Sequence, residues 1–148
     1  MVSALDVASY ILARSGQMTA MKLQKLVYYC QAWSLVWDDK PMFHEKIEAW
    51  INGPVIPQLF DAHRGQYGVN EIAAGDPRKL SEEQKETIKA VLKFYGTKSS
   101  QWLSELTHKE APWRKAREKA GLTDRERGNA EITHEDMYEY YDGLVSKD

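Results

Sequence analysis

The chain has 148 residues, of which 43% are hydrophobic and 28% are charged, and its 20 basic and 22 acidic side chains give a net charge of −2. A chain of this size, within the common range of roughly 100 to 150 residues per domain, buries enough surface to fold without disulfides or metals. The near-neutral charge argues against binding nucleic acid through a basic surface. The single cysteine, Cys30, excludes a disulfide within the chain. We therefore expect one domain over residues 1–148.

No segment has the composition of a membrane span. The longest uncharged runs, residues 26–37 and 49–60, are twelve residues each, whereas a span takes about 20 apolar residues. The first residues also lack the basic and apolar regions of a secretory signal. We expect a cytoplasmic protein with no membrane partner.

The N-terminal part predicts two helices. Residues 3–15 carry apolar side chains at helical spacing, with Ser3 as the N-cap and Gly16 after the last turn. After Thr19, apolar residues recur every three or four positions as far as Asp38, and this pattern predicts a helix with one buried face. That face carries Leu23, Leu26, Val27, Cys30, Trp33 and Trp37.

Between residues 42 and 52 the period changes to two, which favours a short strand and allows a small β-hairpin. The alternating faces are Ile47, Ala49 and Ile51 on one side and Glu48, Trp50 and Asn52 on the other. The following Gly53-Pro54 dipeptide signals a turn, and Pro57 fits the first turn of a helix that ends near Gly65. Residues 65–80 are then predicted to form a long connecting loop.

The second half predicts further helices from their start signals. A capping box at residues 81–84 opens one that ends at Gly96. Ser99 or Ser100 caps the next, and Pro112 opens another. Thr133 opens the last, after a polar loop. The sum is a mainly α fold, a compact single-domain bundle of about seven helices without a separate DNA-binding domain.

The residue patterns indicate no catalytic or metal site. The four histidines lie far apart and show no metal-ligand spacing. His134-Glu135-Asp136 fits the start of a helix, where acids complement the dipole. Cys30 falls in register with core residues, and the Gly65 to Gly68 segment follows a helix instead of preceding one, unlike a phosphate loop. We expect no enzyme, no cofactor and no metal, and a small hydrolase or transferase stays as an alternative.

Two neighbouring segments carry opposite charge. Residues 109–127 contain seven basic and four acidic side chains, a net of +3, and residues 131–148 contain one basic and six acidic ones, a net of −5. Two explanations stay open: these surfaces contact other proteins, or they neutralise one another and are solvated.

Three blocks of sequence resemble a known family. The first is Lys22-Leu23-Gln24-Lys25-Leu26-Val27-Tyr28-Tyr29, continuing through Gln31-Ala32-Trp33. The second is Pro41-Met42-Phe43, Glu45, Ile47-Glu48-Ala49-Trp50 and Gly53-Pro54-Val55-Ile56-Pro57. The third is Leu106-Thr107-His108, Pro112-Trp113 and Ala116-Arg117. Together they make the chain similar to the SocA-like, or Panacea, antitoxin domain family, which includes GepA-like phage-associated proteins.

The resemblance implies a mostly helical antitoxin, bacterial or prophage-encoded, that binds and neutralises a toxin encoded by the adjacent gene. One branch of the family is thought to act as an adaptor that delivers its toxin to a bacterial protease. The first helix begins by Leu5, which leaves no room for an appended helix-turn-helix domain and argues against transcriptional autoregulation. A phage or mobile-element protein that targets a host factor stays open as a second hypothesis.

The motif residues are most simply structural. They are Leu23, Lys25, Leu26, Tyr28, Tyr29, Trp33, Ala49, Gly53, Pro54 and Val55. Most of them fall on the expected core face, and the Gly53-Pro54 turn needs special backbone geometry. A motif of this kind identifies a fold without having to contact a ligand.

The aromatic side chains divide into two groups. Those in helical register are expected in the core: Trp33, Trp37, Phe60, Tyr95 and Tyr141. The others, with the polar residues near them, are candidate partner-binding residues: Trp50, Glu48, Tyr67, His108, Trp113 and Arg114. Trp, Tyr and Arg are the side chains that dominate binding hot spots. Burial of Trp50 beneath a helix remains the alternative for that residue.

Overall fold

The structure, a computed structural model, describes residues 2–146 and confirms the mainly α prediction. Seven α-helices lie within these residues: α1 (Ala4–Ser15), α2 (Ala20–Trp37), α3 (Pro57–His63), α4 (Glu82–Tyr95), α5 (Ser100–Lys109), α6 (Ala111–Lys119) and α7 (His134–Val145). The strands are β1 (Met18–Thr19), β2 (Ile47–Trp50), β3 (Gly53–Val55), β4 (Gly68–Val69) and β5 (Glu131–Ile132), and a short 3-10 turn, η1, spans Pro77–Lys79. None of the helices is long and apolar enough to cross a membrane, within the residues described.

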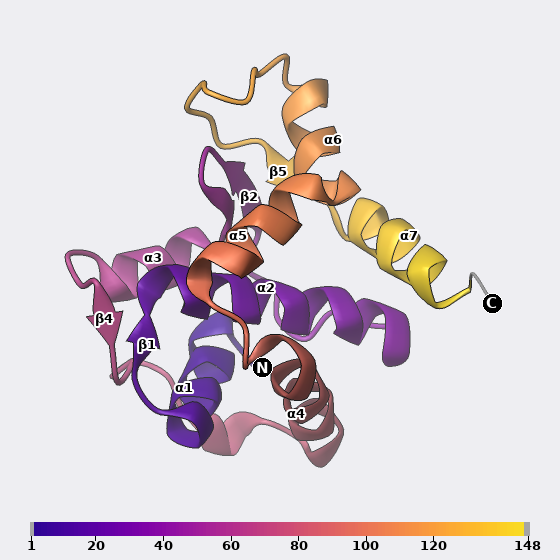
Figure 1. The fold of residues 1–148 in the computed structure, drawn as a ribbon. Helices are drawn as coiled ribbons and strands as arrows, with labels where there is room; N and C mark the ends of the chain where they lie inside the picture. Colours follow the sequence, from indigo (N-terminus) through magenta and orange to yellow (C-terminus); the bar gives the residue numbers. More distant parts are fainter. Residues whose placement is uncertain (1, 147–148) are drawn as a thin grey trace.

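Helix α2 runs through the middle of the molecule, and the other elements surround it (Figure 1). It contacts α1, α3, α4, α5, α7 and β3. Every residue from Leu23 to Leu35 is buried, including the polar Gln24, Lys25 and Gln31. The expectation of a single buried face is therefore wrong, because partners cover the helix on all sides. The uncharged run at residues 26–37, which forms the C-terminal part of this helix, agrees with its burial on all sides.

The predicted helix starts are confirmed by their caps. The Ser3 hydroxyl accepts a hydrogen bond from the backbone N–H of Asp6, and the residues 81–84 form a complete capping box. Ser99 and Thr133 accept in the same way at the starts of α5 and α7. Such caps satisfy backbone donors that the first turn leaves unpaired, so they depend on nearby sequence alone. In α6 the first residue is Ala111, one position before the predicted Pro112.

A β-hairpin forms, but it begins later than the range 42–52 allowed for it. Strand β2 pairs with β3 in antiparallel register, with Glu48 opposite Val55 and Trp50 opposite Gly53, and β5 pairs with the other edge of β2. Gly53 has a φ of 125°, and a Cβ added there would lie 3.2 Å from Cε of Lys25. Gly53 is the first residue of β3 and its backbone angle favours glycine, whereas the turn lies at Ile51 and Asn52 and not at the predicted Gly53-Pro54.

A second small sheet was not predicted. Strands β1 and β4 pair antiparallel, with Met18 opposite Val69. Beside them, the backbone N–H of Ala20 donates to the carbonyl oxygen of Tyr67 at 2.9 Å. Two residues per strand are too few to show a period in the sequence, but this sheet ties the loop after α3 to the start of α2.

The expected division of the aromatic residues is correct for three core members and wrong for three others. Trp33, Tyr95 and Tyr141 are buried. Trp37 is 47% exposed because α2 extends past its neighbours, although its ring stacks on Trp33. Phe60 is only half-buried, and it lines a groove. Trp113, expected outside the core, is 3% exposed.

A buried hydroxyl network joins α2, α7 and the junction between α5 and α6. The hydroxyls of Tyr29 and Tyr141 donate to Oε1 of Glu110 at 2.8 and 2.7 Å. Tyr141 has then used its proton, so the Tyr28 hydroxyl, 3.0 Å away, donates to it. Burial raises the pKa of Glu110 from 4.5 to about 7. The network is therefore centred on one buried carboxyl group.

Candidate partner-binding groove

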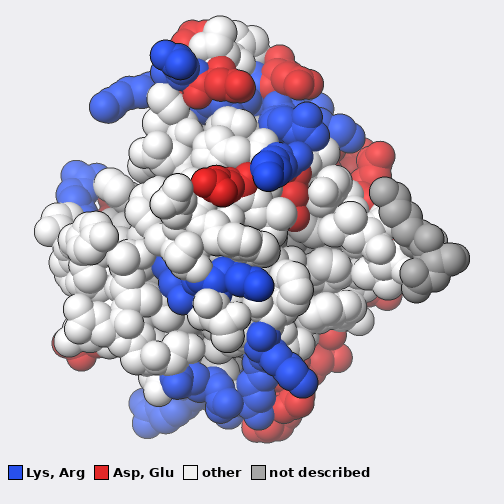
Figure 2. Space-filling model, in the orientation of Figure 1, with Lys and Arg blue, Asp and Glu red and all other residues white. Residues whose placement is uncertain are grey.

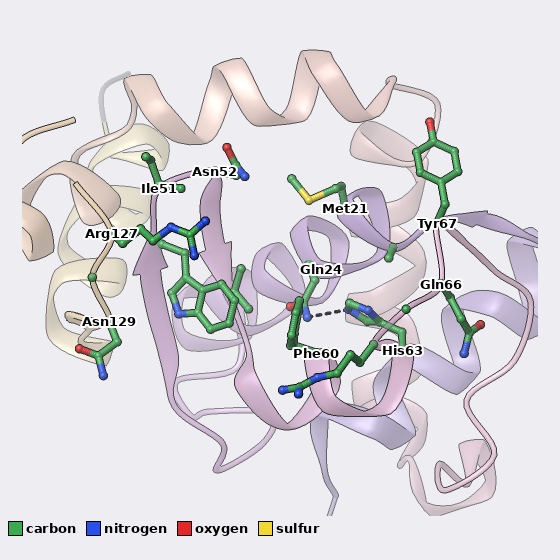
Figure 3. Close-up of a pocket in the computed structure, with 16 residues that line it drawn as sticks. Met21, Gln24, Ile51, Asn52, Phe60, His63, Gln66, Tyr67, Arg127 and Asn129 are labelled. Carbon is green, nitrogen blue, oxygen red and sulfur yellow. Dashed lines mark hydrogen bonds between the residues drawn. The ribbon is translucent and has the colours of Figure 1, made fainter. Parts of the chain in front are cut away.

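A groove of about 680 Å³ opens where four parts of the chain meet: the start of α2, the β2–β3 hairpin, α3 with its following loop, and the loop after α6 (Figure 3). Apolar and aromatic side chains line most of it, among them Met21, Trp50, Phe60 and Tyr67. Its volume falls in the usual range of ligand pockets, roughly 300 to 1,000 Å³. It is larger than a second cavity of about 310 Å³, which Leu35, Lys40 and Tyr138 line.

Trp50 is the aromatic residue that the hairpin supplies to the groove. The β2 alternation turns Ile47 and Ala49 into the core and leaves Glu48 and Trp50 partly exposed. The indole N–H of Trp50 donates to Oε1 of Glu48 at 2.8 Å, and its ring meets Phe60 edge-on at 5.1 Å. Trp50 is thus held in place while part of its ring stays open to the groove.

Tyr67 stands at the opposite edge of the groove from Arg127 (Figure 3). Its side chain is 84% exposed, the highest value among the large hydrophobic residues described. Its backbone carbonyl is fixed by Ala20, and Gly65 begins the loop with a φ of 83°. An exposed ring on an anchored backbone loses little backbone freedom when it binds.

A buried polar pair supports the groove from below. Oε1 of Gln24 accepts from the backbone N–H of Ile56 at 2.8 Å, which fixes the amide orientation. Nε2 of Gln24 must then donate to Nε2 of His63, 3.0 Å away. Burial lowers the pKa of His63 below 6.5, so the ring is neutral at pH 7. His63 therefore positions α3 and presents no free base to the groove.

Arg117 holds the wall formed by the loop after α6. Its guanidinium, 2% exposed, donates to the carbonyl oxygens of Ala49 at 2.8 Å, Thr123 at 2.7 Å and Glu126. It also lies 5.1 Å from the ring of Trp113. These contacts connect α6, the loop and the hairpin. Arg117 belongs to the third block of the family resemblance, but nothing in the sequence around it predicts this role.

The remaining predicted site residues lie behind or away from the groove. The indole N–H of Trp113 donates to the carbonyl oxygen of Trp50 at 2.7 Å. The ring nitrogens of His108 contact the carbonyl oxygens of Ser104 at 2.6 Å and Ile51 at 3.1 Å. Both residues thus support the hairpin from within. Arg114 is exposed on α6 and does not line the groove.

The structure thus brings two predicted residues, Trp50 and Tyr67, into one groove and places Glu48 beside it. Sequence reasoning missed Met21, Phe60, Arg64 and Arg127, which also line it. Phe60 sits in helical register and therefore looked like a core residue. The two arginines carried no local signal, because the loops that hold them are distant in sequence.

Charge at the groove has one sign. Arg64 lies 5.4 Å over the ring of Phe60 and pairs with Asp61 at 3.0 Å, an exposed and therefore weak contact. Arg127 makes no ion pair with any residue from 2 to 146. Figure 2 shows that the side of the molecule over α3, β1 and β4 is mostly uncharged, with charged side chains gathered toward the loop after α6 and toward the opposite end.

One ion pair within residues 2–146 joins the oppositely charged segments near the C-terminus. Nζ of Lys119 lies 2.8 Å from Oδ2 of Asp136, which links α6 to α7. Arg117 is buried, so the exposed charge of the basic segment is smaller than its composition indicates. These observations favour mutual neutralisation without deciding between the two explanations.

Two features bear on catalysis. No group of three or more His, Cys, Asp or Glu side chains within residues 2–146 is arranged to hold a metal ion. Cys30 is fully buried, and burial raises the pKa of its thiol. A thiol that stays protonated is a poor nucleophile. The environment of Cys30 therefore agrees with the prediction that it is a core residue.

Comparison with known proteins gives one match. The family model described as antitoxin SocA-like, Panacea domain, matches residues 23–114. No curated protein and no solved structure matches the chain significantly. The matched segment exceeds half of the chain and runs from α2 through the hairpin, α3, α4 and α5 into α6. The chain belongs to the SocA-like antitoxin family with a Panacea domain.

Proposed function

We propose that this protein is an antitoxin that neutralises a toxin by binding it directly, without catalysis. Membership of an antitoxin family implies a toxin as partner in general. The observation that carries the proposal is the groove, in which the rings of Trp50 and Phe60 pack edge to face beside the exposed Tyr67. Exposed aromatic side chains in a concave site are typical anchors of protein interfaces.

The groove supplies the centre of the proposed interface and its surroundings supply the rest. Stable complexes bury about 1,200 to 2,000 Å² in total, which is more than a groove of this size offers. The neighbouring surface over α3, β1 and β4 is mostly uncharged and continues from the groove (Figure 2). In this proposal the toxin loses activity because the antitoxin covers its working surface.

Co-expression with the protein encoded by the adjacent gene tests the proposal. We expect that protein to stop growth when produced alone and to be harmless when this chain is produced with it. The two should also co-purify as a stable complex. If growth is not rescued and no complex forms, the antitoxin function is refuted.

The same experiment separates occlusion from delivery to a protease. In direct neutralisation the toxin accumulates as a stable complex while growth continues. In an adaptor mechanism the toxin level falls on co-expression and recovers in a strain that lacks the protease. Immunoblotting of the toxin during rescue therefore decides between the two mechanisms.

A further inference from the structure

The groove contains cations but no acid. Sixteen residues line it, and they include Arg64 and Arg127 but neither Asp nor Glu (Figure 3). Two carboxylates contact lining residues, since Glu48 accepts from the indole N–H of Trp50 and Asp61 pairs with Arg64. Arg127 extends into the opening from the side opposite Tyr67, and nothing among residues 2–146 pairs with it. Arg127 is therefore the lining cation whose charge is left without a partner among these residues.

The start of α2 adds to this positive potential. Ala20 and Met21 line the groove at the first turn of the helix. That turn contains no acidic residue to complement the helix dipole, in contrast to α1, α4 and α7. A helix N-terminus favours a nearby negative charge. The dipole and the arginines therefore act in the same direction.

The edge of the groove carries side-chain amides. Asn52, Gln66 and Asn129 are exposed there, one from each of three walls (Figure 3). No hydrogen bond of these three side chains to residues 2–146 is found. An amide offers both donors and an acceptor, which is what a peptide backbone needs from a binding surface. These side chains fit an extended segment of chain better than a purely apolar molecule.

The floor is apolar and shaped by rings. Met21 is 40% exposed, and Phe60 and Trp50 are half-buried beside it. An aromatic or aliphatic side chain inserted here would cover the open faces of these rings. The removal of this apolar surface from water favours binding. The floor thus specifies one large apolar residue of the ligand.

We infer that the groove binds a segment of the partner protein that carries a large apolar side chain next to an aspartate or glutamate. The apolar residue fits against Trp50 and Phe60, and the carboxylate lies between Arg127 and Arg64. The inference rests on the proposed function in that the partner is a protein. A groove of about 680 Å³ has room for only a few side chains, so the segment is short.

Selection from a random library of short displayed peptides tests this inference without the toxin. The wild-type chain is the bait, and the double variant Arg64→Glu with Arg127→Glu is used to discard peptides that bind elsewhere. We expect the retained peptides to be enriched in Asp or Glu beside Phe, Trp, Tyr, Leu, Ile or Met. Failure to retain any peptide, or retention of peptides without acids, overturns the inference.

Affinity measurements then locate the binding. Retained peptides, synthesised with a fluorescent label, should bind the Arg64→Glu with Arg127→Glu variant about tenfold or more weakly, since attraction becomes repulsion at two sites. The control is Lys115→Glu with Arg125→Glu, which changes the same net charge at exposed positions outside the groove. Equal weakening by both variants would show that peptide affinity depends only on the overall charge of the protein, and this result would overturn the inference.

The antitoxin function and the preference of the groove for acidic segments can be refuted independently of each other. A chain that rescues growth but selects no acidic peptide remains an antitoxin with a different binding surface. If the chain binds acidic peptides in the groove but neutralises no toxin, the inferred specificity of the groove stands and the proposed antitoxin function is refuted. Single variants at Arg64 and at Arg127, both exposed, serve if the double variant does not fold.

Discussion

At the scale of single residues, the aromatic side chains have two distinct roles. Tyr28, Tyr29 and Tyr141 satisfy a buried carboxyl group and hold the helices together. Trp50 and Tyr67 face a groove, where Trp50 is half-buried against Phe60 and Tyr67 is 84% exposed. Helical register predicted burial for Tyr141 but not for Tyr28 and Tyr29, which lie outside the face of α2 that was predicted to be buried. It could not predict exposure for Trp37 or burial for Trp113, because both depend on where neighbouring elements end.

Tyr67→Ala is expected to weaken toxin binding while leaving the fold intact. The side chain is 84% exposed, so the free energy of unfolding should change by less than about 0.5 kcal/mol. A hot-spot loss of about 2 kcal/mol corresponds to roughly thirtyfold weaker binding, measurable by calorimetry with the purified toxin. Tyr138→Ala, an exposed tyrosine on α7, is the control. Equal affinities for the two variants would exclude Tyr67 from the interface.

Glu110→Gln is expected to change how stability depends on pH. The folded state holds the Glu110 proton up to about pH 7, whereas a carboxyl with the ordinary pKa of 4.5 loses it earlier. This contribution to stability is therefore complete below pH 4.5 and is lost as pH rises to about 7. The wild type should lose on the order of 3 kcal/mol over that window relative to the variant, which does not titrate.

Urea unfolding at the two ends of this pH window measures the difference. Glutamine keeps an oxygen that can accept from Tyr29 and Tyr141, so the network retains its shape. Glu105→Gln, exposed on α5, is the control and should follow the wild type at each pH. If wild type and Glu110→Gln show parallel pH dependence, Glu110 does not hold its proton in the folded state.

At the scale of elements, local signals predicted the helices well and the groove poorly. Caps and apolar spacing at Ser3, Thr19, Ser99 and Thr133 depend on a few adjacent residues, so the sequence contains them. The groove is assembled from segments separated by up to about a hundred positions, and a single sequence does not show which loops meet. The burial of α2 on all sides between Leu23 and Leu35 likewise depends on which elements pack around it.

The loop after α6 is the element whose position depends most on one side chain. Arg117→Lys replaces a planar group that reaches three carbonyl oxygens with an ammonium that cannot span them. We expect the free energy of unfolding to fall by about 1.5 to 3 kcal/mol. Amide hydrogen exchange across residues 121–130 should become faster, because the loop loses its anchor.

Arg114→Lys is the matched control, since it makes the same change on the exposed side of the same helix. It should stay within about 0.5 kcal/mol of the wild type. Unchanged exchange in the loop of Arg117→Lys would show that other contacts hold this wall of the groove.

At the scale of the whole molecule, the fold places a positively charged apolar groove on one side of a helix core. Helix α2 supports the groove with Gln24 and forms one end of it, while α3, the hairpin and the loop after α6 close the other sides. Composition indicated a near-neutral chain, which fits a ligand that is another folded protein. The local excess of arginine at the groove was not visible in that average.

The most direct test of the central claim is growth rescue by two charge-reversal variants, each co-expressed with the product of the adjacent gene, which is the proposed toxin. The variant with Arg64→Glu and Arg127→Glu is predicted to lose rescue, because its groove repels the acidic segment. The variant with Lys115→Glu and Arg125→Glu, equal in net charge, is predicted to rescue like the wild type. Full rescue by the groove variant, with both proteins folded and equally abundant, would contradict neutralisation through this groove.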